Sequence, residues 1–215
     1  MAERLVRVDL HVHSSASWDC AVPPVQVATR CRSLGIGPVF LTDHDTIAGA
    51  LELRRADSRG SIAGQEVTTA EGDLIGLFLE RSIESGLPPE EAARRIRAQG
   101  GLVYLQHPYD RRRRSLPEAT IERLAAAIDV VEVFNGRCSP ADNRRAGDLC
   151  EILGAAPGAG SDAHTLDEIG AVYVELPAFS GAQDFLAKLR WARIVRDPSR
   201  WRLRLEALAG AVAGR

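Results

Sequence analysis

Short runs of apolar and β-branched residues alternate along this chain with longer stretches in which alanine and arginine form an amphipathic pattern. Apolar runs of about four to eight residues, bounded by polar or glycine-containing segments, are typical of strands. The pattern predicts strands at residues 5–12, 38–42, 61–68, 74–79, 102–106, 130–134, 156–159 and 172–176. A regular succession of strand and helix implies parallel strands joined by helical crossovers.

The amphipathic stretches begin with recognisable helix starts. Residues 88–91 read Pro-Pro-Glu-Glu, and a first helical turn tolerates proline and favours acidic side chains. Ser115, Ser139 and Ser180 resemble N-caps, the first and last with the spacing of a capping box. Polar residues recur at strand ends throughout the sequence, which favours a barrel over a doubly wound sheet. We therefore predict an α/β fold of the barrel type.

Length and composition are those of one globular domain. The chain has 215 residues, of which 45% are hydrophobic and 26% are charged, enough to bury a substantial core. It contains no repeats, linkers or low-complexity segments. We predict a single domain over residues 1–215, with its core at about 5–195. The tail at about 199–215 is expected to form a last helix or a poorly ordered end.

The composition also indicates where the protein is found. No stretch approaches the roughly 20 apolar residues that cross a membrane, and the N-terminus runs into the first strand without the features of a secretory signal. Four cysteines without CxxC spacing read as reduced thiols. These features predict a soluble cytoplasmic protein without a membrane partner. A net charge of −2 without a long basic stripe argues weakly against a dedicated nucleic-acid surface. Nothing in the sequence indicates the oligomeric state.

All five histidines lie at predicted strand ends or just beyond them, next to acidic residues or a proline. The segments that contain them are 9–13 (Asp-Leu-His-Val-His), 43–45 (Asp-His-Asp), 107–108 (His-Pro) and 161–164 (Ser-Asp-Ala-His). A single histidine is more often structural than a ligand. Packing alone does not explain five of them at equivalent points of a βα pattern, so the pattern predicts a metal site.

The spacing within these segments has a physical logic. Residues i and i+2 of a strand share a face, so His11 and His13 converge on one side with Asp9 below them. Two imidazoles on one strand form a chelate, and the other ligands then come from other strand ends. Glu66 and Asp162 can each bridge two ions, because a carboxylate has two oxygens. Mixed histidine and carboxylate ligation suits Zn, Mn or Fe and leaves the identity of the metal open.

The ordered set of motifs resembles the PHP (polymerase and histidinol phosphatase) family over roughly residues 6–176. The set is His-x-His, Asp19, Asp-His, Gly-x-Glu, His-Pro and Ser-Asp-Ala-His, in this order. The resemblance implies a distorted seven-stranded, TIM-like β/α barrel with a trinuclear metal site at the carboxyl ends of the strands. It implies two or three divalent ions, the first on His11, His13, Glu66 and Asp162, the second on Glu66 and His107, and the third on Asp19, His44 and His164.

One position departs from the fullest family pattern. Where many members supply a further histidine or cysteine to the second metal, this chain has Asn135. An amide oxygen is neutral, so the second site is expected to be weak, completed by water or empty. Asn135 is then expected either to coordinate or to face the substrate. Cys138 follows closely but is expected to lie beyond the strand end.

This centre predicts a hydrolase that acts on phosphate esters. Divalent ions lower the pKa of a bound water and neutralise charge on the phosphoryl oxygens in the transition state. We expect Asp162 to orient the attacking hydroxide, and His164 or His44 to assist the leaving oxygen. Asp9 and Asp43 lie just upstream of ligands and are expected to orient the imidazole rings.

Four consecutive arginines at 111–114 follow the His-Pro motif on a loop at the same end of the fold. A guanidinium matches phosphate oxygens bidentately. Most of the run reads as a solvated charged loop, but we expect at least one member to bind substrate phosphate, with Arg111 and Arg113 as the candidates. Arg137 and Asn135 are further candidates for substrate binding. Tyr109 is expected to be an ordinary residue of the rim.

Three other functions fit part of the pattern. An amidohydrolase acting on C–N bonds can share the His-x-His opening, but binuclear members commonly carry a carboxylated lysine, and the single lysine, Lys188, falls in a predicted surface helix. A 3′–5′ exonuclease module, which is a known use of the family, needs a basic groove with stacking aromatics, and aromatic residues are only 5% here. A non-enzymatic metal-binding protein is disfavoured because eight ligand types match. The compact chain favours a small phosphorylated metabolite or nucleotide as the substrate.

Overall fold

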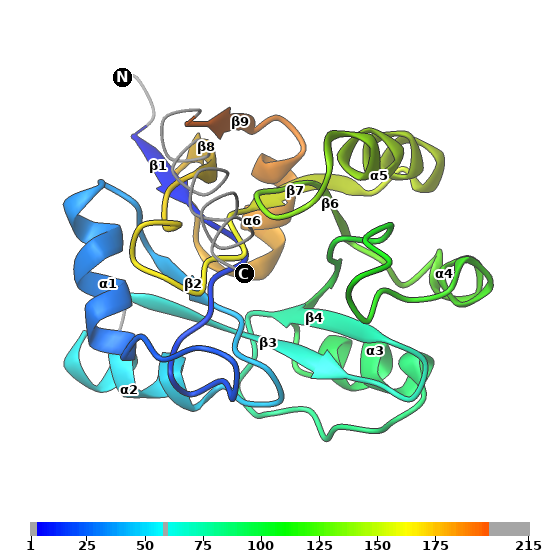
Figure 1. Ribbon diagram of the computed structural model, residues 1–215, viewed down its shortest axis with the longest axis horizontal. Coiled ribbons are helices and arrows are strands. Elements are labelled where there is room, and N and C mark those ends of the chain that lie inside the picture. The colour runs from blue at the N-terminus through cyan, green and yellow to red at the C-terminus, as the bar shows by residue number, and fades with distance from the viewer. Residues whose placement is uncertain (1–3, 58–59, 198–215) are drawn as a thin grey trace, which may run out of the picture.

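The computed structural model describes residues 4–57 and 60–197, which form two sheets and their covering helices (Figure 1). The larger sheet has six strands in the order β2-β3-β4-β5-β6-β7. These are β2 (Val39–Leu41), β3 (Ser61–Thr68), β4 (Asp73–Leu77), β5 (Leu102–Leu105), β6 (Val130–Asn135) and β7 (Ala156–Gly160). The smaller sheet has the order β1-β8-β9, from β1 (Leu5–Val8), β8 (Val172–Pro177) and β9 (Arg193–Arg196). Each predicted strand is present, and β9 was not predicted.

The helices are α1 (Pro24–Ser33), α2 (Ala48–Ala56), α3 (Pro89–Arg97), α4 (Glu118–Leu124), α5 (Pro140–Leu153) and α6 (Gly181–Leu189). The predicted start of α3 is confirmed, and Ser139 caps α5 by accepting a hydrogen bond from the backbone N of Asp142 at 3.1 Å. The prediction for Ser115 was wrong, because Pro117 occupies the N-cap position of α4. Ser180 occupies the N-cap position of α6 without a side-chain cap.

The predicted all-parallel arrangement was wrong in the middle of the large sheet. β4 runs antiparallel to both β3 and β5, whereas β2-β3, β5-β6 and β6-β7 are parallel. Only residues 69–72 join β3 to β4, and a parallel return needs a crossover of about a dozen residues. Gly72, with φ of 156°, lies in this short connection.

The predicted seven-stranded barrel is not confirmed, because the expected first strand stops at Val8. Its continuation, residues 9–13, lies between the two edges of the six-stranded sheet. On one side the backbone N of Leu10 donates to the carbonyl of Ala159 at 3.3 Å. On the other, the N of Thr42 donates to the carbonyl of Val12 at 2.9 Å. This histidine-bearing segment therefore bridges a curled sheet through isolated hydrogen bonds, while β1 itself pairs with β8 in the smaller sheet.

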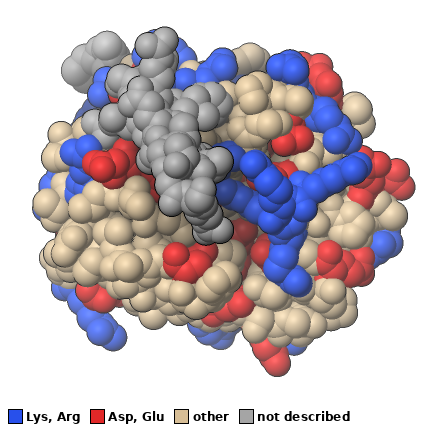
Figure 2. Space-filling view, viewed as in Figure 1, with Lys and Arg blue, Asp and Glu red and all other residues tan. Residues whose placement is uncertain are grey.

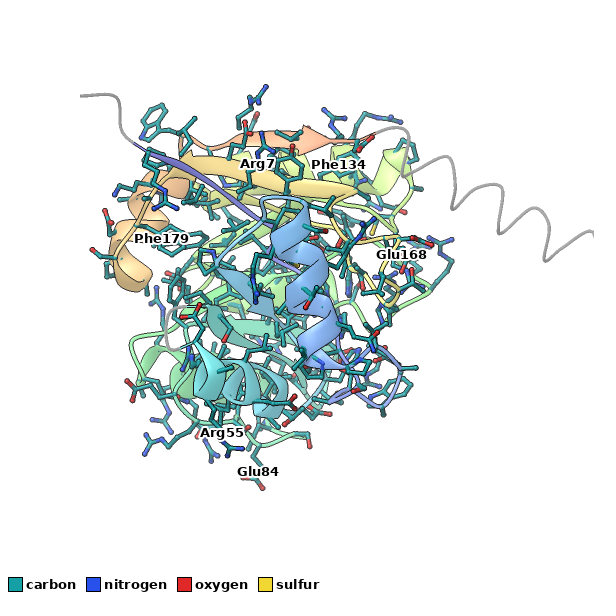
Figure 3. All side chains as sticks on the ribbon, turned by 90° about the vertical axis from the view of Figure 1, so that its left-hand side faces the viewer. Arg7, Arg55, Glu84, Phe134, Glu168 and Phe179 are labelled. Atoms are coloured by element: carbon teal, nitrogen blue, oxygen red, sulfur yellow. The ribbon has the colours of Figure 1, made fainter. Side chains whose placement is uncertain are left out.

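Apolar side chains cover both faces of the large sheet. One cluster lies on the side of α1 to α4 and includes Val27, Leu53 and Ile96. The other fills the inside of the curl, between the two sheets and α6, and includes Phe40 and Phe185. Figure 3 looks onto α1 and α2 and shows the smaller sheet, which carries Arg7, as a separate layer at the end opposite Arg55 and Glu84.

Among the described residues, no helix is long and apolar enough to cross a membrane. The tail predicted at 199–215 lies outside the described residues.

Candidate metal centre

The eight predicted ligands converge at one end of the six-stranded sheet. They come from the segment after β1 (His11, His13, Asp19), from the ends of β2 and β5 (His44, His107), from β3 itself (Glu66) and from the segment after β7 (Asp162, His164). Each belongs to at least one group of three donors whose ligand atoms all lie within 4.8 Å of one another. One of these groups adds Asp73, which the sequence analysis did not select. Convergence from five segments is what the βα pattern predicted.

The two histidines of the His-x-His motif direct their Nε2 atoms toward each other and toward Glu66. Their Nε2 atoms are 3.1 Å apart, and the Nε2 of His11 is also 3.1 Å from Glu66 Oε2. Burial by itself lowers the pKa of His11, but Glu132 and Glu66 raise it to about 9. Burial lowers the pKa of His13 to about 3. Two ring nitrogens that converge beside a carboxylate oxygen form a donor set that fits a divalent ion.

Glu66 lies at the centre of the cluster and is fully buried. Its Oε1 is 3.2 Å from Nε2 of His107, while its Oε2 is 3.3 Å from Nε2 of His13 and 3.6 Å from that of His44. Burial by itself raises the pKa of Glu66, but the surrounding histidines hold it well below its ordinary value. An ionised carboxylate whose two oxygens face different imidazoles has the geometry of a bridging ligand.

The outer part of the cluster lies at the mouth of the site. Asp19 Oδ2 is 2.8 Å from Nε2 of His164 and 3.4 Å from Nε2 of His44. Within the described part of the chain, two buried atoms of this group have no hydrogen-bond partner, Oδ1 of Asp19 and Nδ1 of His44. Buried polar atoms are rarely left unsatisfied. The unsatisfied Oδ1 of Asp19 fits a carboxylate that coordinates an ion.

Glu132 on β6 is the functional side chain that the sequence analysis missed. It is fully buried and accepts four hydrogen bonds: from His11 Nδ1 at 3.0 Å, the Tyr104 hydroxyl at 3.0 Å, the backbone N of His107 at 2.8 Å and Asn135 Nδ2 at 2.9 Å. Burial by itself raises its pKa, but the charge of His11 lowers it. Because the carboxylate accepts from Nδ1, the Nε2 lone pair of His11 faces the cluster. A charged residue inside the apolar run 130–134 was the available signal.

Asp9 and Asp43 do not orient imidazole rings, so that prediction was wrong. Asp9 accepts from the backbone N of Ser161 at 2.8 Å and of His11 at 3.3 Å. Asp43 accepts from the backbone N of Ser14 at 2.6 Å and from its hydroxyl at 2.8 Å. Both carboxylates hold the backbone of ligand-bearing loops, because those loops leave strand pairing and expose N–H groups that need acceptors.

Close backbone approach places β7 against the His-x-His segment. A Cβ added at Gly160 would lie 2.4 Å from Cβ of His11, so only glycine allows this contact. The glycine-rich run before Asp162 is thereby explained. His107 and Asp162 have positive φ values of 28° and 55°, a strained conformation that is typical of functional sites.

Asn135 is fully buried below the cluster. Its Oδ1 accepts from the backbone N of Arg137 at 2.7 Å, and its Nδ2 donates to Glu132 and, at 3.1 Å, to Asp162 Oδ2. The Nδ2 group of Asn135 therefore positions the carboxylate of Asp162, and its Oδ1 is occupied by a hydrogen bond from the backbone. Cys138 is buried, with its Sγ 3.8 Å from Asp110 Oδ2.

A cavity of about 420 Å³ opens above the cluster, with arginines on one wall. Figure 2 shows a contiguous basic patch beside the hollow, over the loop between β5 and α4. Arg113 reaches Asp162 Oδ2, and Nη1 of Arg137 lies 2.6 Å from Nδ1 of His164. Arg112 and Arg114 also line the cavity but pair with Asp110 and Asp73, at 3.0 and 3.1 Å.

The structure does not bring Arg111 into this cavity. Arg111 lines a separate hollow of about 470 Å³, together with Tyr109 and Arg145. The guanidinium of Arg145 lies 3.8 Å from the centre of the Tyr109 ring. Of the two arginine candidates in the 111–114 run, only Arg113 reaches the donor cluster.

The fold is α/β and the cluster is a candidate metal site. Comparison with known proteins identifies the family. The family model described as PHP-associated matches residues 140–194. An uncharacterised protein of Methanocaldococcus jannaschii is 38% identical over 176 residues, which cover 79% of this chain and 70% of that protein. The chain belongs to the PHP domain family, as the motifs predicted.

Solved structures share the fold at low identity. A two-domain protein of Bacteroides vulgatus, containing a predicted PHP-like metal-dependent phosphoesterase, is 18% identical with a TM-score of 0.73, over 90% of this chain and 65% of that one. Endonuclease Q, in complex with a 27-mer duplex substrate that has an abasic lesion at the active site, is 15% identical with a TM-score of 0.64, over 87% of this chain and 57% of that one. The chain therefore spans less than two thirds of both proteins.

Proposed function

We propose that the protein is a metal-dependent phosphoesterase that hydrolyses a small phosphorylated metabolite or a nucleotide. The proposal rests mainly on one observation, which is that a floor of imidazoles and carboxylates and a wall of guanidinium groups border the same cavity. The floor holds imidazoles and the carboxylates of Glu66 and Asp162, while Arg113 and Arg137 reach in from the side. A phosphate ester placed between them meets metal ions below and guanidinium groups beside it.

The donor geometry supports the distribution of ligands that the family resemblance implies. His11, His13, Glu66 and Asp162 would hold one ion, Glu66 and His107 a second, and Asp19, His44 and His164 a third. When bound, such divalent ions supply Lewis acidity that activates water and stabilises charge on the phosphoryl oxygens. The buried amide of Asn135 supplies no ligand oxygen in this arrangement, which leaves His107 and Glu66 as the protein ligands of the second ion.

The residues of the chain then take distinct roles. Asp162, held by Asn135 and reached by Arg113, is placed to orient the attacking water. Arg113 and Arg137 bind the phosphoryl oxygens. His164 and His44 lie at the partly exposed mouth of the cavity, and one of them assists the leaving oxygen.

A second candidate function is hydrolysis of a phosphodiester in nucleic acid. The structural likeness to Endonuclease Q and the basic patch beside the cavity favour it. An amidohydrolase of the lysine-bridged kind is not supported, because Lys188 lies on α6 and binds Ala178 O and Asp184 at 2.7 and 2.9 Å.

The test combines metal analysis with activity. Protein purified without chelators would be analysed for bound metals and assayed with added Mn or Zn against phosphomonoesters, nucleotides and a labelled oligonucleotide. Bound metal with phosphate release from small esters supports the first proposal, and cleavage of the oligonucleotide alone supports the second. A protein that binds no metal under these conditions refutes both. Glu91→Gln, on the partly exposed face of α3 and outside the cavity lining, should leave both metal content and activity unchanged.

A further inference from the structure

One large aromatic ring stands on the wall of the cavity. Trp18 lines it together with the donor residues and the arginines, and it is 81% exposed. One side of its ring faces His44, with ring centroids 5.4 Å apart and planes tilted by 31°. Single exposed apolar residues are common on protein surfaces, and Trp191, which is 89% exposed, is one of them. Trp18 differs because it belongs to the wall of the site.

The loop that carries Trp18 is anchored on both sides of the ring. Before it, the Ser17 hydroxyl accepts from the backbone N of His44 at 2.7 Å, and Ser14 is held by Asp43. After it, Asp19 bonds to His164 at 2.8 Å. The backbone on either side of Trp18 is therefore positioned by the same contacts that position the ligands. A ring presented in this way loses little conformational freedom when it binds a partner.

We infer that Trp18 is a stacking platform for the base of a nucleotide whose phosphate lies between the donor cluster and Arg113. This inference rests on the proposed function and names its substrate class. The rest of the described lining is charged or imidazole, so a saturated sugar phosphate would offer the exposed ring only the C–H groups of its sugar. A flat π system in the substrate matches it, because stacking on an aromatic side chain accepts any base. A free nucleotide and the terminal nucleotide of a nucleic-acid strand both present a base to Trp18.

The experiment compares two substrates that differ only in the base, adenosine 5′-monophosphate and ribose 5-phosphate. With the metal-loaded enzyme, Trp18→Ala should lower the ratio of their kcat/KM values by roughly tenfold or more, mainly through KM. Trp18→Phe should restore most of the ratio, and Trp191→Ala should leave it unchanged. The kcat/KM of a short oligonucleotide is compared with that of ribose 5-phosphate in the same way. If Trp18→Ala changes neither the ratio for the nucleotide nor the ratio for the oligonucleotide, the inference is overturned and the proposed function stays intact.

A second readout does not depend on turnover. Adenosine 5′-monophosphate should quench the tryptophan fluorescence of the wild type, and Trp18→Phe should abolish that quenching. Quenching that is identical in both proteins overturns the inference. The same titration with a short oligonucleotide distinguishes a free nucleotide from the end of a strand. If no phosphate ester is hydrolysed at all, the proposed function fails while this titration still decides the stacking contact.

Discussion

The floor and the mouth of the metal site are built differently. At the floor, His11, Glu132 and Asn135 are fully buried, and their side-chain groups are held by hydrogen bonds within the protein. At the mouth, Asp19 and His44 are partly exposed, and each keeps a buried atom that no described residue satisfies. The floor is preorganised by the protein, whereas the mouth has donor capacity left for something that the protein does not supply.

Two carboxyl groups near the site, Asp9 and Asp19, differ in their ionisation. Burial raises the pKa of Asp9, beneath the floor, to about 7 against the opposing effect of hydrogen bonds from Ser161. Burial also acts to raise the pKa of Asp19, at the mouth, but hydrogen bonds from His164 and His44 lower it below its ordinary value. Asp19 at the mouth is therefore held in its ionised form, as are Glu66 and Glu132 at the floor, whereas the Asp9 carboxyl is not.

The largest effect is expected from removal of a floor ligand. His11→Ala should abolish bound metal and reduce turnover by roughly 10³-fold, because a preorganised electrostatic contact is lost together with the ion that it holds. Asp162→Ala should behave in the same way. Elemental analysis and phosphate-release assays measure both effects. His164→Ala, at the mouth, should retain the metal at the floor, and equal loss of metal from both variants would contradict the distinction between the two regions.

Glu132→Gln should weaken metal binding by about 10- to 100-fold, the usual effect of losing a group that orients a metal-bound histidine. The amide keeps the shape of the side chain but no longer presents two anionic oxygens to four donors. Competition with a chelator of known affinity measures the change. Tyr104→Phe, which removes only one of the four hydrogen bonds, is the matched control and should change affinity less. An unchanged affinity in Glu132→Gln would show that the floor does not tune the metal.

Gly160→Ala should destabilise the protein by about 1–3 kcal/mol, because the added methyl group would overlap His11. Urea denaturation measures the free energy of unfolding. Gly147→Ala is the control, since a Cβ there meets no atom within 4 Å and α5 gains helix propensity. The idea of a tightly packed floor fails if the two variants are equally stable.

The stability of the metal-free protein should also depend on pH. The folded-state pKa of Asp9 is about 7, above its ordinary value of 3.8, so the folded metal-free protein binds one more proton than the unfolded chain between these values. The free energy of unfolding should therefore fall as pH rises from about 4 to 7, by at most about 1.4 kcal/mol per pH unit. Asp9→Asn should remove the contribution of Asp9 to this slope and leave that of Asp73, whose pKa burial raises to about 6. Denaturation of chelator-treated protein at several pH values measures the slope, and a slope that is unchanged in Asp9→Asn assigns it to other groups.

Most of the donor cluster could be predicted because its signals are local. His11 and His13 are two residues apart on an extended segment, and the other ligands sit at strand ends that an α/β sheet brings to one edge. The partners of those ligands could not be predicted in the same way. Glu132 lies 121 residues from His11 in the sequence, and no periodicity connects them. Asp9 and Asp43 are acidic residues just before ligands, as expected of groups that orient imidazole rings, but they accept hydrogen bonds from the backbone instead.

The arginine run and the large sheet show the same contrast between what local sequence predicts and what it does not. The run 111–114 marked a basic loop, but only its fold places Arg113 over Asp162 while Arg111 faces another hollow. The alternation of strands and helices identified the elements, whereas the four-residue connection at 69–72 turned β4 antiparallel. The sequence by itself determined which residues could bind metal and which segments form strands, since both depend on residue type and short spacing. The direction of β4 follows from the short connection at 69–72, which is also a local feature. Tertiary structure decided closure by residues 9–13 and the contacts of each carboxylate, because these depend on which distant segments meet.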